Sequence, residues 1–181
     1  LETLNVPAYK VASMEIIDIP LIKKIAATGK PVIVSTGMAK LSEIEEAIRT
    51  LRENGSGPIA LLKCTSQYPA KPEDANLATI KNLADTFGCV AGLSDHTLGT
   101  AVPITACAIG ARIVEKHFIA SREEGGPDST FSLEPAEFKE MVDSVRIAEK
   151  SIGEIKYGGV KNENQTRKFR RSLFVVKDMK K

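Results

Sequence analysis

The amino-acid sequence predicts an α/β fold in which parallel strands alternate with helices. Five apolar runs of strand length recur at intervals of roughly 25 residues, which is the pattern of a βα repeat. The runs are apolar throughout, as expected for strands covered on both faces of a sheet. Segments with apolar residues at helical spacing lie between them. The predicted strands are residues 8–13, 31–36, 59–65, 90–94 and 112–118.

The clearest helix signal lies in residues 41–54. Ser42 and Glu45 have the spacing of a capping box, in which two side chains accept hydrogen bonds from free backbone N–H groups at a helix start. Gly55 predicts the end of this helix, because glycine readily adopts the left-handed conformation that follows a final turn. The apolar stripe comprises Leu41, Ile44, Ile48 and Leu51.

Two further helices are predicted later in the chain. Asn76 is a candidate N-cap for a helix over residues 77–87, which ends before Gly88. Pro135 favours the start of a last helix, because proline is well tolerated in a first turn. The apolar stripes are Leu77, Ile80, Leu83 and Phe87 in the first, and Phe138, Met141, Val142, Val145 and Ile152 in the last.

Five βα units favour part of a TIM barrel, which has eight such units and carries its chemistry on the loops after the strands. A doubly wound open sheet is the competing fold. No Gly-x-Gly-x-x-Gly sequence opens a helix, which disfavours the dinucleotide-binding version of that sheet. Residues 154–170 are polar and predict a linker, and residues 172–176 predict a strand of a further unit. Because the chain begins without Met and ends in a charged run, we expect a fragment of a longer protein.

Composition argues against two classes of partner. The formal net charge of +2 is too small to favour nucleic acid or a membrane surface. The basic residues 167–171 predict a solvated or phosphate-facing linker, and the longest apolar stretch, residues 101–111, is too short to span a bilayer. Few cysteines, odd in number and within apolar runs, are typical of reduced thiols, so we expect a cytoplasmic protein. The cysteines are Cys64, Cys89 and Cys107.

Polar side chains follow the carboxyl end of every predicted strand. Hydroxyls beside a lysine on one rim suit a phosphate or a carboxylate, because they donate hydrogen bonds and the ammonium supplies charge. Serine and threonine are also common wherever a strand becomes a loop, so a single one carries little weight. In chain order the groups are Lys10, Ser13 and Glu15; Ser35 and Thr36; Thr65, Ser66 and Tyr68; Ser94, Asp95 and His96; and Lys116 and His117, with Asp128 in the next loop.

The two histidines occupy equivalent places, each just past a predicted strand. If these strands are parallel neighbours, His96 and His117 converge at one sheet edge and can hold a divalent metal, with water and substrate as the other ligands. A pair of structural imidazoles is the alternative. Asp95 is either a ligand, a partner that orients His96, or a carboxylate that caps its own loop.

Glu15 is a candidate acid or base at the mouth of the barrel. A carboxylate does this work when it is partly desolvated. The alternative is a glutamate at a helix N-terminus, where the helix dipole favours negative charge.

Six ordered segments resemble the sialic acid synthase (NeuB-like) family across essentially the whole chain. They are residues 9–15, 35–38, 64–69, 92–97, 115–118 and 126–128. The resemblance implies a TIM barrel followed by a small antifreeze-like (SAF) domain. On that map residues 1–153 resemble about strands four to eight of the barrel, residues 154–170 the linker, and residues 171–181 the truncated start of the SAF domain.

The resemblance also implies a reaction. Phosphoenolpyruvate condenses with an open-chain N-acetylated amino sugar to give a nine-carbon 2-keto acid and phosphate, and a divalent metal, Mn²⁺ or Mg²⁺, polarises the sugar aldehyde. The full-length protein would be a homodimer. By position, the metal ligands would be His96 and His117; the phosphoenolpyruvate-binding residues Lys10, Ser13, Ser35, Ser66 and Ser94; the acid/base Glu15; and the sugar-binding residues Tyr68 and Asp128.

Two departures resemble the pseudaminic acid synthase branch. N-acetylneuraminate-making members often carry asparagine at the position of Ser66, and a different sequence in place of residues 129–135. The implied acceptor is a 6-deoxy-2,4-diacetamido hexose, which Phe131 would suit unless it is a buried packing residue. The alternatives are an N-acetylneuraminate or legionaminate synthase, a metal-dependent barrel hydrolase, and a non-catalytic half-barrel.

Overall fold

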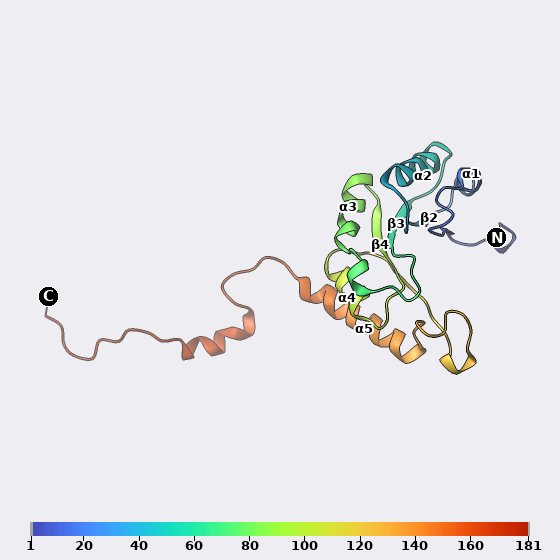
Figure 1. Ribbon diagram of the computed structural model, residues 1–181. Helices are drawn as coiled ribbons and strands as arrows, with labels where there is room; N and C mark the ends of the chain where they lie inside the picture. The colour runs from blue at the N-terminus through green and yellow to red at the C-terminus, as the bar shows by residue number, and fades with distance from the viewer. Residues whose placement is uncertain (1, 181) are drawn as a thin grey trace.

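The computed structural model describes residues 2–180 and contains one parallel five-stranded sheet in the order β1-β2-β3-β4-β5 (Figure 1). Each strand pairs in parallel with the next strand along the chain, and helices connect them, as the sequence predicts. The strands are β1 (Tyr9–Val11), β2 (Val32–Ser35), β3 (Ile59–Cys64), β4 (Val90–Asp95) and β5 (Val114–Lys116). The α-helices are α1 (Ile19–Ala26), α2 (Leu41–Glu53), α3 (Ala78–Phe87), α4 (Ala101–Ala108) and α5 (Pro135–Ile152), and short 3₁₀ helices span Glu2–Leu4, Pro72–Asp74, Arg122–Glu124 and Lys161–Phe169.

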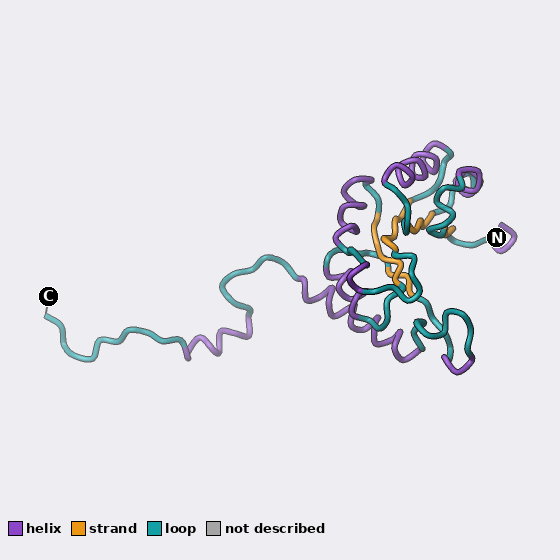
Figure 2. The backbone as a smooth tube through the Cα atoms, in the orientation of Figure 1, coloured by secondary structure: helices purple, strands orange, loops and turns teal. Residues whose placement is uncertain are grey.

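An ion pair between the two edge strands reports how strongly the sheet curves. Lys10 on β1 and Glu115 on β5 lie with Nζ and Oε2 3.3 Å apart. In a flat sheet, four strand spacings of about 4.8 Å would separate these backbones by about 19 Å, beyond the reach of the two side chains. The sheet is therefore half of a barrel with the helices on its outer side (Figure 2), and the open-sheet alternative is wrong.

The hydrophobic core lies between the sheet and the helices. Alternate strand residues such as Val11, Val34 and Leu61 are fully buried there, against Ile22 of α1 and Leu51 of α2 among others. Burying such side chains supplies the main stabilisation of the fold. The intervening strand residues point to the inside of the half-barrel, because successive strand side chains face opposite ways.

Both predicted helix caps are wrong in detail. Helix α2 already begins at Leu41, so Ser42 lies inside its first turn, and the cap is made two residues earlier than predicted, by Glu43, whose Oε2 accepts the backbone N–H of Lys40 at 2.6 Å. Asn76 has φ of +45° and donates to the carbonyl of Asp74, and it therefore does not cap α3. The predicted C-terminal ends, residues 54 and 87, lie within one residue of the observed ends at Glu53 and Phe87.

The C-terminal part of the described chain extends away from the half-barrel (Figure 1). The predicted strand at residues 172–176 does not form, because no neighbouring strand supplies a ladder for its backbone groups, and Leu173 and Phe174 are 102% and 80% exposed. The division into a linker and the start of a SAF domain stays a prediction, and its outermost residues, Leu1 and Lys181, lie outside the described residues.

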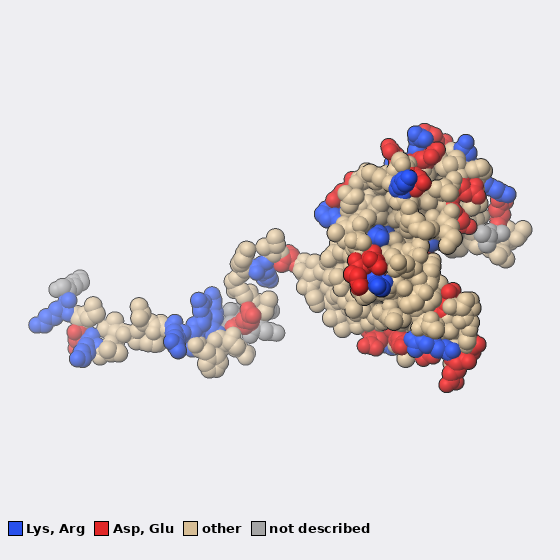
Figure 3. Space-filling model, viewed as in Figure 1, with Lys and Arg blue, Asp and Glu red and all other residues tan. Residues whose placement is uncertain are grey.

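Charged side chains are distributed differently over the two parts of the molecule. Lys and Arg gather along the C-terminal extension, whereas both signs are interspersed over the face of the half-barrel seen in Figure 3. None of the described helices is both long enough and apolar enough to cross a membrane.

Candidate functional site

The structure brings the two predicted metal ligands together. Strands β4 and β5 are in register up to Asp95 and Lys116, so the next residue of each strand is a histidine. The rings of His96 and His117 have centres 5.1 Å apart and lie nearly edge to face. A metal lies about 2.1 Å from an imidazole nitrogen, so two imidazoles that share an ion have ring centres about 4.5–6.5 Å apart. The observed spacing falls within that range.

Both imidazoles use Nδ1 for a contact with an oxygen atom. Nδ1 of His96 lies 2.8 Å from the carbonyl of Thr65, and Nδ1 of His117 lies 3.5 Å from a carboxylate oxygen of Asp128. Such oxygens hold the proton on Nδ1 and leave the lone pair on Nε2, which is the usual arrangement of a metal-binding histidine.

The surroundings shift the two histidines in opposite directions. Burial and the neighbouring His96 lower the pKa of His117, which favours the neutral ring that a metal requires. Burial also disfavours the charged form of His96, but hydrogen bonds with the Cys64 thiol and the Thr65 carbonyl outweigh it, so the pKa of His96 is raised.

The donor set fits a metal with an incomplete protein shell. Within residues 2–180, no group of three or more His, Cys, Asp and Glu side chains is placed to hold an ion. An ion on the two Nε2 atoms would take its other ligands from water or substrate, as catalytic sites do. Two nitrogens completed by oxygens suit Mn²⁺ better than Mg²⁺, which prefers an all-oxygen shell.

Two aromatic rings line the histidine pair. The ring centres of Tyr68 and His96 are 4.2 Å apart, and those of Phe131 and His117 are 4.9 Å apart. Tyr68 is 49% exposed, whereas Phe131 is only 3% exposed. Phe131 is therefore a packing residue that supports His117, and Tyr68 and Asp128 are the predicted sugar-binding groups that remain accessible.

Two predicted anion-binding hydroxyls, those of Ser13 and Ser66, lie against the loop after β2, and a third belongs to Ser35 at the end of that strand. The backbone N–H of Gly37 donates to Ser13 Oγ at 3.1 Å, and a side chain at Gly37 would collide with the hydroxyls of Ser13 and Ser66. The hydroxyl oxygens of Ser35 and Ser66 are buried and have no hydrogen-bond partner among the described residues. Buried hydroxyls normally have partners, so these two are available to a bound anion.

Glu115 is a site residue that the sequence prediction missed. Its carboxylate accepts from Ser94 Oγ at 2.6 Å and forms the 3.3 Å ion pair with Lys10, so it joins two predicted phosphoenolpyruvate-binding residues. The available signal was its position two residues before His117, because residues two apart on a strand share a face.

Cys64 was also missed, because it was assigned to an apolar run. It is register-paired with Ser94 on the inside of the half-barrel, and its sulfur lies 4.0 Å from Nδ1 of His96. Burial alone would raise the pKa of this thiol, but hydrogen bonds with His96 and Ser13 prevail and lower it to about 7. All three cysteines are free thiols.

Asp95 and Lys116 do not face the predicted site. The Asp95 carboxylate accepts from the backbone and hydroxyl of Thr97, and Lys116 pairs with it at 2.6 Å. Both point to the outer side of the sheet, so the expectation that Lys116 lies at the rim is wrong. Asp95 caps its own loop, which was one of its three predicted roles, and it is not a metal ligand.

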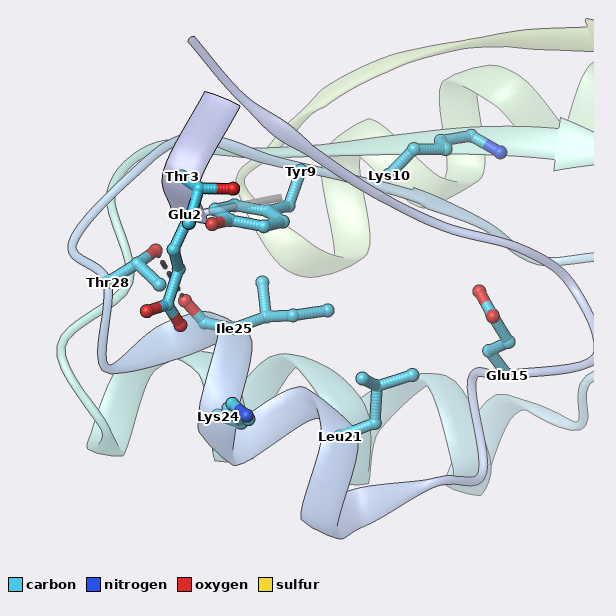
Figure 4. Close-up of a pocket in the computed structure, with 9 residues that line it drawn as sticks. All are labelled: Glu2, Thr3, Tyr9, Lys10, Glu15, Leu21, Lys24, Ile25 and Thr28. Atoms are coloured by element: carbon cyan, nitrogen blue, oxygen red, sulfur yellow. Dashed lines mark hydrogen bonds between the residues drawn. The ribbon is translucent and has the colours of Figure 1, made fainter. Parts of the chain in front are cut away.

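Glu15 lies in the turn between β1 and α1, where its carboxylate accepts the N–H of Ala12 at 2.8 Å. Asp18, not Glu15, caps α1, so the helix-terminus alternative is wrong. Glu15 and Lys10 lie at one end of a cavity of about 440 Å³ beside β1 (Figure 4). The other end is lined by Glu2, Thr3 and Thr28.

The sequence matches the model of one protein family. The model of the NeuB family matches residues 1–157. The chain belongs to the NeuB family. It is 46% identical to the pseudaminic acid synthase of Helicobacter pylori over 182 residues, which are 100% of this chain and 54% of that enzyme. It is 41% identical to the N,N'-diacetyllegionaminic acid synthase of Campylobacter jejuni over 184 residues, which are 100% of this chain and 55% of that enzyme.

A solved structure of this family has the same fold. The N-acetylneuraminic acid synthetase of Leptospira borgpetersenii, crystallised with citrate, matches with a TM-score of 0.84 at 36% identity, over 96% of this chain and 60% of that one. The half-barrel is therefore part of a TIM barrel of the NeuB type. The chain spans about half the length of the curated relatives it matches.

Proposed function

We propose that this chain forms part of the barrel of a nonulosonic acid synthase. The reaction joins C3 of phosphoenolpyruvate to the aldehyde carbon of an open-chain N-acetylated amino sugar. Water attacks C2, the C–O bond to phosphate breaks, and the products are a nine-carbon 2-keto acid and phosphate. The observation that carries the proposal is the pair of close imidazoles beside buried hydroxyls that lack partners.

Phosphoenolpyruvate would bind to the serines and the lysine on the inside of the half-barrel. Lys10 supplies positive charge, and the free hydroxyls of Ser35 and Ser66 donate hydrogen bonds to the phosphate or carboxylate oxygens. Ser13 and Ser94 would complete the anion site. Lys10 and Ser94 are bonded to the Glu115 carboxylate in this structure, so the anion would have to displace that carboxylate from them.

His96 and His117 would hold Mn²⁺ or Mg²⁺, with Mn²⁺ favoured by their two nitrogens. When bound, the ion would act as a Lewis acid on the sugar aldehyde. Tyr68 and Asp128, on the open side of the histidines, would orient the acceptor sugar. Glu15 would serve as acid/base near C3 and the attacking water, which requires its carboxylate to leave the N–H of Ala12.

For the acceptor we propose the 6-deoxy-2,4-diacetamido hexose of pseudaminic acid synthases. The identity of 46% with the Helicobacter pylori pseudaminic acid synthase and the sequence after Asp128 support this choice. Two alternatives remain: a legionaminate synthase, because of the 41% identity with such an enzyme, and an N-acetylneuraminate synthase, because of the 36% identity with the Leptospira borgpetersenii synthetase.

A half-barrel without catalytic activity is the second proposal for the chain by itself. Strands β1 and β5 each have a neighbour on one side only within residues 2–180, and unpaired parallel edges favour association with another segment. We propose that a complete barrel and a homodimer are required for turnover. Activity of the isolated chain equal to that of the complete gene product would contradict this second proposal.

The test is a phosphate-release assay on the complete gene product with Mn²⁺ and a panel of acceptor sugars. We expect release only when phosphoenolpyruvate and an acetamido sugar are both present, and fastest with the diacetamido 6-deoxy hexose. Equal release without any sugar would indicate a phosphatase and contradict the proposed function. Comparable or faster turnover with N-acetylmannosamine would contradict the acceptor assignment alone.

A further inference from the structure

A buried ion pair lies immediately behind the two histidines. Asp95 ends β4 and Lys116 ends β5, and they are the last residues paired in the register of these strands. Their Oδ2 and Nζ atoms are 2.6 Å apart, and each side chain is only 1% exposed. The next residue of the first strand is His96, and the next residue of the second is His117. We call Asp95 and Lys116 the buried pair.

Hydrogen bonds satisfy the buried pair and connect it to one loop residue. The Asp95 carboxylate accepts from the backbone N–H and the hydroxyl of Thr97, both at 3.0 Å. Lys116 also donates to the carbonyl of Thr97. The start of the loop after β4 is therefore held to β5 by charge-assisted bonds, which are about twice as strong as neutral ones.

The register of β4 and β5 ends at the buried pair. The carbonyl of His96 accepts from the N–H of Ala70, and the carbonyl of His117 accepts from the N–H of Leu133, each at 2.9 Å. The backbones of the two histidines are therefore bonded to different segments of the chain. The buried pair is the last link between β4 and β5 before the backbones carrying the two rings diverge.

Fold stability does not explain a fully buried ion pair. Removing two charges from water costs several kcal/mol per ion, and apolar replacements of such pairs are often neutral or stabilising. A buried pair can instead select one arrangement among several of similar energy. The arrangement selected here is the spacing of the strand ends that carry His96 and His117.

We infer that Asp95 and Lys116 are positioning residues that set the separation of the two imidazoles and thereby the affinity for the metal. This inference rests on the proposed function, because it assigns a metal to His96 and His117. Neither residue of the buried pair touches substrate or ion. They act on the histidines through the backbone. Loss of the buried pair should therefore weaken metal binding without a matching loss of stability.

The test is the double variant Asp95→Asn/Lys116→Met, which removes both charges and leaves none unpaired. We expect the complete gene product to bind Mn²⁺ about 10- to 100-fold more weakly, the range for loss of a group that orients metal ligands. Electron paramagnetic resonance of free Mn²⁺ measures this affinity without turnover. The thermal midpoint and the affinity for phosphoenolpyruvate without metal should be unchanged.

A matched control is available on α3. Lys81 and Asp85 form an ion pair with the same 2.6 Å separation, but their side chains are 74% and 63% exposed. The variant Lys81→Met/Asp85→Asn should bind Mn²⁺ as the wild type does. Thr97→Val keeps the buried pair and removes one hydrogen bond to it, so it should weaken Mn²⁺ binding less than the double variant does. This variant also tests the inference if the double variant fails to fold.

The outcomes separate this inference from the proposed function. Wild-type affinity for Mn²⁺ in a folded Asp95→Asn/Lys116→Met variant would overturn the inference and leave the metal assignment intact. If that variant does not fold, unchanged affinity in Thr97→Val would overturn it. No binding of Mn²⁺ by the wild type would overturn both the inference and the metal assignment.

Discussion

The outer and inner faces of the same sheet carry different kinds of side chain. Apart from the buried pair Asp95 and Lys116, the outer face is apolar, and Val34 and Leu61 are fully buried there beneath the helices. The inner face carries charges and hydroxyls, including buried oxygens of Ser35 and Ser66 without partners. The inner side chains nearest the rim, one from each strand, are Lys10, Ser35, Cys64, Ser94 and Glu115.

Strand alternation separates stability from binding in this protein. Apart from the buried pair, which acts on the histidines through the backbone, a substitution on the outer face should change the free energy of unfolding and leave ligand affinity per folded molecule intact. A substitution on the inner face should do the reverse. The difference is sharp because neighbouring residues of one strand, such as Val34 and Ser35, belong to opposite faces.

The largest expected effect on the inner face is loss of a histidine. His96→Ala or His117→Ala in the complete gene product should abolish turnover and weaken Mn²⁺ binding by more than the roughly 100-fold caused by loss of an orienting group. Mn²⁺ titration and the phosphate-release assay measure the two effects. Retained Mn²⁺ stoichiometry in either variant would contradict the metal assignment.

On the outer face, Leu61→Ala should lower the free energy of unfolding by about 2–5 kcal/mol, because it leaves a cavity in a fully buried site. Denaturant unfolding measures this loss. Phosphoenolpyruvate affinity, corrected for the folded fraction, should not change. A large loss of affinity in the folded protein would show that the two faces are not independent.

Ser35→Ala should weaken phosphoenolpyruvate binding without lowering the free energy of unfolding. The hydroxyl is buried without a partner, so its removal should leave the free energy of unfolding unchanged or raise it. Phosphoenolpyruvate should bind about 10- to 160-fold more weakly, since a hydrogen bond to a charged group contributes about 1.5–3 kcal/mol. Thermal melting and calorimetric titration test this, and destabilisation together with unchanged affinity would contradict it.

The smallest effect is expected for Glu115→Gln. The substitution removes a negative charge that competes with an incoming anion for Lys10, while the amide oxygen still accepts from Ser94. Both charged side chains are partly exposed, so the gain in phosphoenolpyruvate affinity should be about 1 kcal/mol or less. Weaker binding would indicate instead that Glu115 holds Lys10 in place.

The order of the elements was predictable from sequence because apolar runs and helical stripes reflect burial directly. The face of the sheet on which each strand residue lies was not predictable, because strands covered on both sides lack alternation. For this reason Glu115 and Cys64 were missed and Lys116 was placed at the rim. The cap of α2 was missed because Lys40 is not a typical capping residue, and its N–H is satisfied by Glu43 alone. The convergence of His96 and His117 was predictable because parallel strands end at one edge.

The central claim is that His96 and His117 share one ion beside an anion site on the inner face. Anomalous diffraction from crystals of the complete gene product grown with Mn²⁺ and phosphoenolpyruvate tests it most directly. The account predicts one Mn²⁺ peak within coordination distance of both Nε2 atoms, with phosphoenolpyruvate against Lys10 and the free serine hydroxyls. An Mn²⁺ peak elsewhere, or an anion bound away from this face, would contradict it.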